Sequence, residues 1–210
     1  MANDNSESLS GAFSARGNDE LEKQYSDWAA TYDAENAALG FRLPILAAGL
    51  FAGYVPVDGE PVLDAGCGTG LAGDNLHILG YHNLMGIDLS EPMLAEAQKL
   101  GIYKGLDKMV LGERLNFAAN KFSAVIVTGV FTEGHAPHSS FDELIRVTRS
   151  GGYIVFNIRN DIYEEQGFRE KMEKLEAENK WQLAERSAKF RPFTVHEAHV
   201  IARLFCYQVS

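Results

Sequence analysis

Residues 62–70 read Val-Leu-Asp-Ala-Gly-Cys-Gly-Thr-Gly, an apolar run that ends in a glycine-rich turn. The apolar residues predict a buried strand over residues 61–65, and Leu71–Leu79 has the pattern of a helix that ends before Gly80. Glycine in such a turn permits positive φ and leaves room for a ligand beside the backbone. The amides that open the following helix favour an anionic group such as a carboxylate. The stretch therefore predicts a strand, a ligand-binding loop and a helix.

Downstream of this loop, short apolar runs alternate with amphipathic segments. Strands are expected over residues 84–88, up to about Leu111, and over 122–128 and 153–158, with helices over 92–100 (Ser90 as its N-cap) and 141–147. This alternation predicts a mostly parallel α/β sheet with helices on both faces.

The last fifty residues break the alternation. They predict one long charged helix over residues 162–180 and two strands over 181–187 and 200–209. The segment between these strands is too short for a parallel crossover, so we expect an antiparallel hairpin at the sheet edge.

Upstream of the loop, residues 1–18 are rich in Asn, Ser, Gly and Asp and predict a mobile tail. Residues 19–56 predict helices, with Tyr25, Trp28 and Tyr32 on one face and a helix start at Pro44. Residues 19–210 are thus expected to form one domain, with helices over 19–56 and the core over 57–210.

The composition and charge of the chain disfavour a nucleic-acid partner and a membrane location. The chain has 210 residues, is 46% hydrophobic, and carries 19 Lys and Arg against 29 Asp and Glu, a net charge of −10. An acidic surface without a basic run disfavours a nucleic-acid partner. The absence of a long apolar segment or signal pattern disfavours a membrane location, and two cysteines fit a reducing, cytoplasmic compartment.

An acidic residue at the end of the next expected strand strengthens the prediction that the glycine-rich loop binds a ligand. Asp88 lies 22 residues after Gly66. A short carboxylate at a strand end can accept hydrogen bonds from both hydroxyls of a ribose. The dinucleotide fingerprint would have its third glycine at position 71, which is Leu here, so the spacing departs from that of a nicotinamide-dependent dehydrogenase.

Taken together, VLDAGCGTG and GIDLS resemble the first motif and acidic loop of class I S-adenosylmethionine-dependent methyltransferases. Within that family, TGVFTEGHAP, ELIRVTRSGG and YIVFNIRND are similar to the group around the methyltransferase-like protein of the Williams–Beuren syndrome region. The resemblance implies a Rossmann-like, seven-stranded sheet of order 3-2-1-4-5-7-6 with strand seven antiparallel. It also implies S-adenosylmethionine as cofactor and S-adenosylhomocysteine as product.

The resemblance also implies a set of cofactor-binding residues. Asp64 would hold the loop, the loop backbone would face the methionine part, Asp88 the ribose, and the turn after strand three the adenine. Tyr32 would cover the sulfonium, or simply belong to a buried helical stripe. The positions carried over are Tyr32, Asp64, Gly66, Cys67, Gly68, Asp88, Leu89, Met93, Glu113, Arg114, Leu115, Thr128 and Gly129.

Candidate catalytic groups follow strands four and five, where open α/β sheets place substrates. They are Glu133, His135 and Arg159, with Asn157, Asp161 and Tyr163 close by in the sequence. His135 could instead be an ordinary loop histidine, and Arg159 could pair with Asp161. Methyl transfer needs a base only when the nucleophile arrives protonated, so no base is nominated.

The function expected is methyl transfer to a small molecule, with a protein substrate as the other class left open. The oligomeric state is undetermined. The alternative is a protein that binds S-adenosylmethionine or S-adenosylhomocysteine without catalysis, as a sensor or partner subunit.

Overall fold

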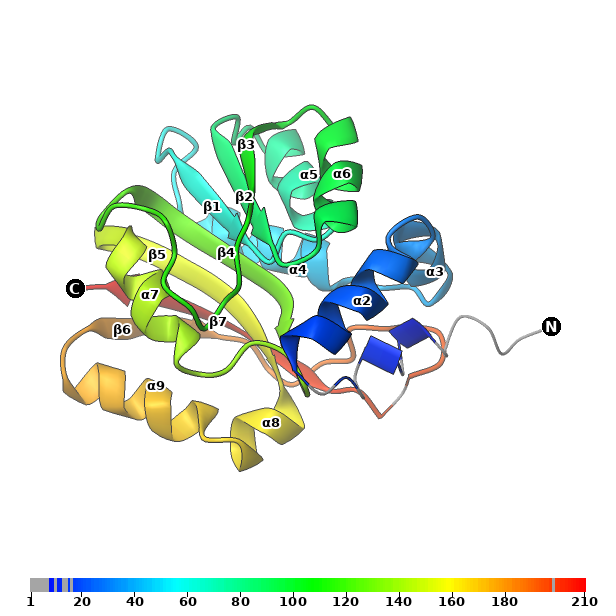
Figure 1. Cartoon of the computed structure of the whole chain (residues 1–210). Coiled ribbons are helices and arrows are strands. Elements are labelled where there is room, and N and C mark those ends of the chain that lie inside the picture. Colours follow the sequence, from blue (N-terminus) through cyan, green and yellow to red (C-terminus); the bar gives the residue numbers. More distant parts are fainter. Residues whose placement is uncertain (1–7, 10, 13–14, 16, 198) are drawn as a thin grey trace.

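The computed structural model describes residues 8–9, 11–12, 15, 17–197 and 199–210. Figure 1 shows a central twisted sheet with helices packed on both of its faces. Its strands are β1 (Val62–Ala65), β2 (Leu84–Asp88), β3 (Tyr103–Lys108), β4 (Phe122–Phe131), β5 (Thr148–Arg159), β6 (Trp181–Arg186) and β7 (Ala202–Val209). The helices are α2 (Asn18–Trp28), α3 (Tyr32–Ala38), α4 (Leu43–Tyr54), α5 (Leu71–Ile78), α6 (Glu91–Lys99), α7 (Ser140–Val147), α8 (Asn160–Glu165) and α9 (Phe168–Ala177).

The sheet has the order β3-β2-β1-β4-β5-β7-β6, as predicted. The first five strands pair in parallel, whereas β7 runs antiparallel to both β5 and β6. The predicted hairpin at the edge is therefore confirmed. The carboxyl ends of β1, β2 and β4 face the same edge of the sheet, where the site lies.

Two apolar layers hold the helices against the sheet. On one face, α7 and α9 bury side chains such as Phe141, Phe168 and Met172 against the sheet. On the other face, α4 and α5 pack residues such as Phe51 and Leu76 on it. The interior of the sheet is thus covered on both sides, which explains why all of β1 and most of β4 are buried.

Two helical predictions need correction. The helix expected over residues 162–180 is two helices, because Gly167 between α8 and α9 adopts a φ of 76°, which ends one helix and starts the next. The helical face expected over 25–32 is interrupted after Trp28, and Tyr32 begins α3.

The segment 1–18 mostly lies outside the described residues. Within it, residues 8–9 and 11–12 are helical, and α2 already begins at Asn18. Leu9 and Ala12 are buried against Trp28 and Phe193, so the expectation of a mobile tail is wrong for these two residues. Burial of their apolar side chains is the physical reason.

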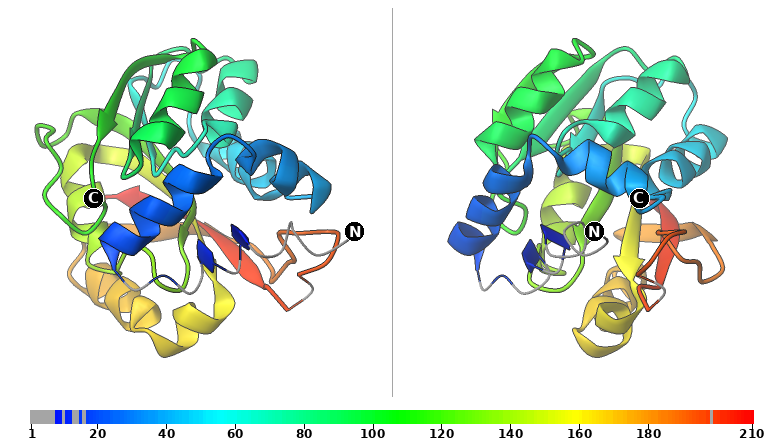
Figure 2. Two further views of the ribbon diagram at one scale, coloured as in Figure 1. Left: turned by 45° about the vertical axis from the view of Figure 1, so that its right-hand side comes forward. Right: turned by 90° about the vertical axis from the view of Figure 1, so that its right-hand side faces the viewer.

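Figure 2 shows that α2 and α3 cross one end of the sheet instead of covering a face. In the described part of the chain, no single helix is long and apolar enough to cross a membrane. The pair α3 and α4 reaches that length and composition only together, across a 90° bend.

Candidate functional site

The glycine-rich loop between β1 and α5 is hydrogen-bonded to the end of the neighbouring strand β2. The amides of Gly66 and Cys67 donate to the Ile87 carbonyl oxygen at 2.8 and 2.9 Å. Gly66 has a φ of 75°, and an added Cβ would lie 2.3 Å from Cγ2 of Val130. Gly68 has a φ of 54° and nothing within 4 Å of an added Cβ, so this side of the loop is open to a ligand.

Asp88 ends β2 directly beside this loop. Its Oδ2 accepts from the Gly68 amide and its Oδ1 from the Ser90 amide, both at 2.9 Å. The carboxylate is only 8% exposed, and burial raises its pKa while the two amides oppose that shift. Each oxygen retains acceptor capacity for a further donor.

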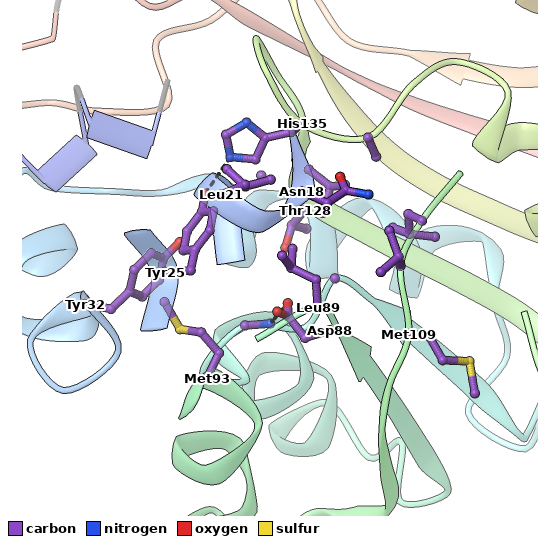
Figure 3. A pocket seen from close by; sticks show the side chains of 17 residues that line it. Asn18, Leu21, Tyr25, Tyr32, Asp88, Leu89, Met93, Met109, Thr128 and His135 are labelled. Carbon is purple, nitrogen blue, oxygen red and sulfur yellow. Dashed lines mark hydrogen bonds between the residues drawn. The ribbon is translucent and has the colours of Figure 1, made fainter. Parts of the chain in front are cut away.

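A cavity opens above Asp88 and the loop (Figure 3). It encloses about 660 Å³ including its mouth, within the range of small-ligand pockets. Its apolar side comes from Leu89, Met93 and Met109, and its far side from Thr128 and Gly129 at the end of β4. Its lining residues are Asn18, Leu21, Tyr25, Tyr32, Gly66, Gly68, Asp88, Leu89, Met93, Met109, Val110, Leu111, Thr128, Gly129, Val130, His135 and Ala136.

Helices α2 and α3 roof this cavity and are tied to the core. Ser26 of α2 shares a 3.1 Å hydrogen bond with Ser90, which caps α6. At the start of α3, Asp33 accepts from the Thr69 hydroxyl of the glycine loop at 2.6 Å. The cavity is therefore closed by residues far upstream of the loop in sequence.

Tyr25 and His135 form a pair within the cavity (Figure 3). Nδ1 of His135 lies 2.7 Å from the Glu133 carbonyl oxygen, and Nε2 lies 2.8 Å from the Tyr25 hydroxyl. A carbonyl oxygen only accepts, so Nδ1 carries the hydrogen and Nε2 accepts from Tyr25. Burial lowers the pKa of His135 to about 4, and the charge of Arg159 adds to that effect. The imidazole is therefore neutral at neutral pH.

Asp64 lies beneath the loop, outside the cavity. Its Oδ2 accepts from the Tyr103 hydroxyl at 2.7 Å. Its Oδ1 has no hydrogen-bond partner among the described residues, although the Gly73 backbone is close enough to lower the pKa. Burial outweighs both contacts and raises the pKa of Asp64 to about 7. Asp64 thus supports the loop through Tyr103.

A smaller recess extends the cavity toward the start of α5. It shares Tyr32, Gly66, Gly68 and Thr128 with the main cavity. Cys67, Thr69 and Leu71 complete its α5 side. The predicted helix start beside the loop is therefore accessible from the cavity.

The structure brings together most of the predicted site but not the turn after β3. Glu113 and Arg114 are exposed and do not line the cavity, while Leu115 is buried in the core, with its amide donating to Glu143. Because β3 ends at Lys108, three residues earlier than expected, Met109, Val110 and Leu111 reach the cavity instead. The expectation for positions 113–115 is corrected accordingly.

The candidate catalytic residues fall into different places. His135 lines the main cavity, whereas Asn157 and Arg159 line a neighbouring cavity. Arg159 is bonded to Asp161 and to Glu133, which extends the pairing considered from the sequence. Tyr163 is buried in the core and lies outside both cavities.

Several lining residues lie outside the set predicted from the sequence, namely Asn18, Leu21, Tyr25, Met109, Val110, Leu111 and Ala136. Tyr25 carried a usable signal, because it shares the aromatic spacing of Trp28 and Tyr32. The apolar residues after β3 carried none, since their role depends on where that strand ends.

Comparison with known proteins identifies the family of this chain. A family model described as a methyltransferase domain matches residues 63–156. Human methyltransferase-like protein 27 is 32% identical over 166 residues, which cover 75% of this chain and 66% of that protein. The chain belongs to the class I S-adenosylmethionine-dependent methyltransferases.

Other members of this methyltransferase family are more distant. The demethylmenaquinone methyltransferase of Renibacterium salmoninarum is 30% identical over 147 residues, covering 65% of this chain and 57% of that protein. The methyltransferase chain thus spans 57–66% of the length of these two curated relatives.

Solved structures share the fold. The chain aligns with a structure of the Haloferax volcanii Trm112 methyltransferase activator in complex with a methyltransferase, at a TM-score of 0.64 and 18% identity, covering 88% of this chain and 97% of that one. A methyltransferase from Mesorhizobium loti aligns at a TM-score of 0.57 and 16% identity, covering 76% of this chain and 96% of that one.

Proposed function

We propose that this chain transfers the methyl group of S-adenosylmethionine to a small molecule by in-line displacement, with proximity and orientation as the main source of catalysis. The observation that carries the proposal is the position of Asp88, a buried carboxylate held at the end of β2 in a cavity roofed by α2.

The residues present fit the cofactor in shape and chemistry. Asp88 offers acceptors to a ribose diol, and Leu89, Met93 and Met109 offer an apolar slot to a flat heterocycle. The recess at the start of α5 suits a carboxylate, because it is lined by Leu71 and Ala72 of the first turn, where helical amides favour an anion. Tyr32 lies at both places and suits a sulfonium by cation–π contact.

When bound, S-adenosylmethionine supplies a methyl group that is already activated by its positive sulfur. The chain must then orient the acceptor, exclude water and take up a proton where the acceptor carries one. Tyr25 and His135 suit the last task. An acceptor hydroxyl can give its proton to the Tyr25 oxygen while the Tyr25 proton moves to Nε2 of His135. With a pKa of about 4, His135 holds that proton only briefly before solvent removes it.

This pairing is tested by nitrogen-15 NMR of the imidazole of His135. We expect the Nδ1–H form throughout pH 5–8, because the ring titrates near pH 4. Tyr25→Phe removes a donor to Nε2, and we expect it to shift the Nε2 resonance without changing which nitrogen carries the hydrogen. A ring that titrates near pH 6.5 would contradict the assigned role.

The cofactor assignment is tested by calorimetric titration with S-adenosylmethionine, S-adenosylhomocysteine and NAD in parallel. We expect micromolar binding of the first two and none of NAD. Binding of S-adenosylhomocysteine alone would support a sensor, and binding of neither would overturn the proposal.

A further inference from the structure

A second cavity borders the cofactor cavity across Gly129. Tyr25, Tyr32 and Gly129 line both cavities. Gly129 has a φ of 74°, and an added Cβ would meet nothing within 4 Å. The two cavities therefore meet along a stretch of backbone that carries no side chain.

The outer wall of the second cavity is aromatic. The rings of Phe41 and Phe193 stack with centroids 4.9 Å apart and an interplanar angle of 22°. Trp28 packs edge-on against Tyr32 at 4.7 Å, and its Nε1 donates to Glu35 at 2.7 Å, which fixes the indole. Walls of this kind suit a flat, apolar molecule.

The inner wall is polar and lies at the ends of β4 and β5. Thr132 is 7% exposed, and its buried hydroxyl has no hydrogen-bond partner among the described residues. Asn157 is 4% exposed, and its Oδ1 accepts from the Gly129 amide at 2.7 Å. That bond orients the amide group, and its NH₂ can donate to a ligand in the cavity. Both residues line the cavity and can donate to an oxygen atom.

The positive charge at this wall is paired with two carboxylates. The Arg159 guanidinium is bonded to Asp161 at 2.8 Å and to Glu133 at 3.1 Å. Its positive charge is therefore compensated before any ligand arrives, and a phosphate or carboxylate would find no free cation in this group. Among the described residues no carboxylate lines this cavity, so an ammonium group would find no counter-ion there.

We propose that this second cavity is the methyl-acceptor site and takes small, planar, uncharged molecules that present an oxygen atom to Thr132 and Asn157. The inference rests on the proposed function, because it assigns the acceptor of that same reaction. The polar wall formed by Thr132 and Asn157, together with the aromatic wall, indicates the chemical class of the acceptor.

Three probes that share one ring system test the class. Protein saturated with S-adenosylhomocysteine is titrated with 1-naphthol, naphthalene-1-sulfonate and 1-naphthylmethylammonium. We expect 1-naphthol to bind tightest, by roughly tenfold, because a charged group would be buried without a counter-ion. Preference for either charged probe, or no binding of 1-naphthol, overturns the proposal.

Thr132→Val is the decisive variant. It preserves shape and removes a buried unpaired hydroxyl, so we expect unchanged or higher resistance to urea and unchanged binding of S-adenosylhomocysteine. Affinity for 1-naphthol should fall roughly fivefold, the typical worth of one hydrogen bond. Thr194→Val is the matched control, since Thr194 follows Phe193 but is exposed and outside the cavity. Equal affinity in both variants overturns the assignment of Thr132.

Failure of the proposed function can be distinguished from failure of the acceptor-site proposal. If S-adenosylhomocysteine does not bind, the cofactor assignment is wrong. The same three probes are then titrated against the free protein, and the same criteria test which chemical class the second cavity binds. If S-adenosylhomocysteine binds and 1-naphthol does not, only the acceptor class is wrong.

Discussion

Asp88 uses one acceptor position on each carboxylate oxygen to hold backbone amides and keeps the rest for a ligand. Asp88→Ala should therefore weaken binding of S-adenosylhomocysteine at least about tenfold, because charge-assisted hydrogen bonds contribute roughly 1.5–3 kcal/mol each. Calorimetry measures the loss. Asp107→Ala is the control, since Asp107 is exposed on β3 outside the cavity. Equal affinities for the two variants would remove Asp88 from the site.

Asp64 makes stability depend on pH. Its pKa rises from 3.8 to about 7 in the folded state, so the folded chain binds more protons than the unfolded chain between these values. Stability should fall as pH rises through this window and level off above it. At about 1.4 kcal/mol per pH unit, the effect is at most about 4 kcal/mol.

Asp64→Asn keeps an acceptor for Tyr103 and removes the charge. In urea unfolding between pH 4 and 8, the variant should lose this slope and match or exceed the parent above pH 7. An unchanged slope would show that Asp64 titrates normally.

At the scale of elements, the break between α8 and α9 depends on the left-handed backbone of Gly167, whose φ is 76°. Gly167→Ala should lower the free energy of unfolding by about 1–2 kcal/mol, because a Cβ is strained in that conformation. Gly49→Ala is the matched test, since Gly49 lies inside α4 with nothing within 4 Å of an added Cβ. It should raise the free energy of unfolding by about 0.5–1 kcal/mol. Changes of the same sign in both variants would contradict the assignment of the break.

Elements with strong local patterns could be predicted from the sequence. The strand at 84–88 and the Ser90 cap of α6 are as expected, because alternation and capping are local signals. The strand β3 ends three residues before the predicted position, so residues 109–111 line the cavity in place of the predicted residues 113–115. The break at Gly167 was not predicted, because a single glycine in a charged helical segment does not by itself indicate the end of a helix. Tertiary packing determines both features.

At the scale of the whole molecule, the order of the seven strands followed from family resemblance, and the antiparallel final hairpin also followed from the short connection before β7. The second cavity could not be predicted, because its walls come from residues as distant as Leu9, Trp28, Asn157 and Phe193. Only the folded chain brings α2, α3 and the segment before β7 together.

The cofactor should also stabilise the whole fold. A ligand that binds only the folded state adds about 2.7 kcal/mol at 100 times its Kd. S-adenosylhomocysteine should therefore raise the melting temperature by about 5–10 °C, whereas NAD should not change it. Differential scanning fluorimetry measures both. A shift caused equally by NAD would point to a general nucleotide site.

Tyr25 and Tyr32 line both cavities, so the same two side chains would contact a ligand in either cavity. With the cofactor and acceptor placed as proposed, we expect exchange of either ligand past α2 to disturb the wall of the other cavity and so to link their departures kinetically. Turnover then favours a compulsory sequence of entry and exit over random exchange. Steady-state inhibition by the spent cofactor would be competitive against the fresh cofactor and of a different type against the acceptor.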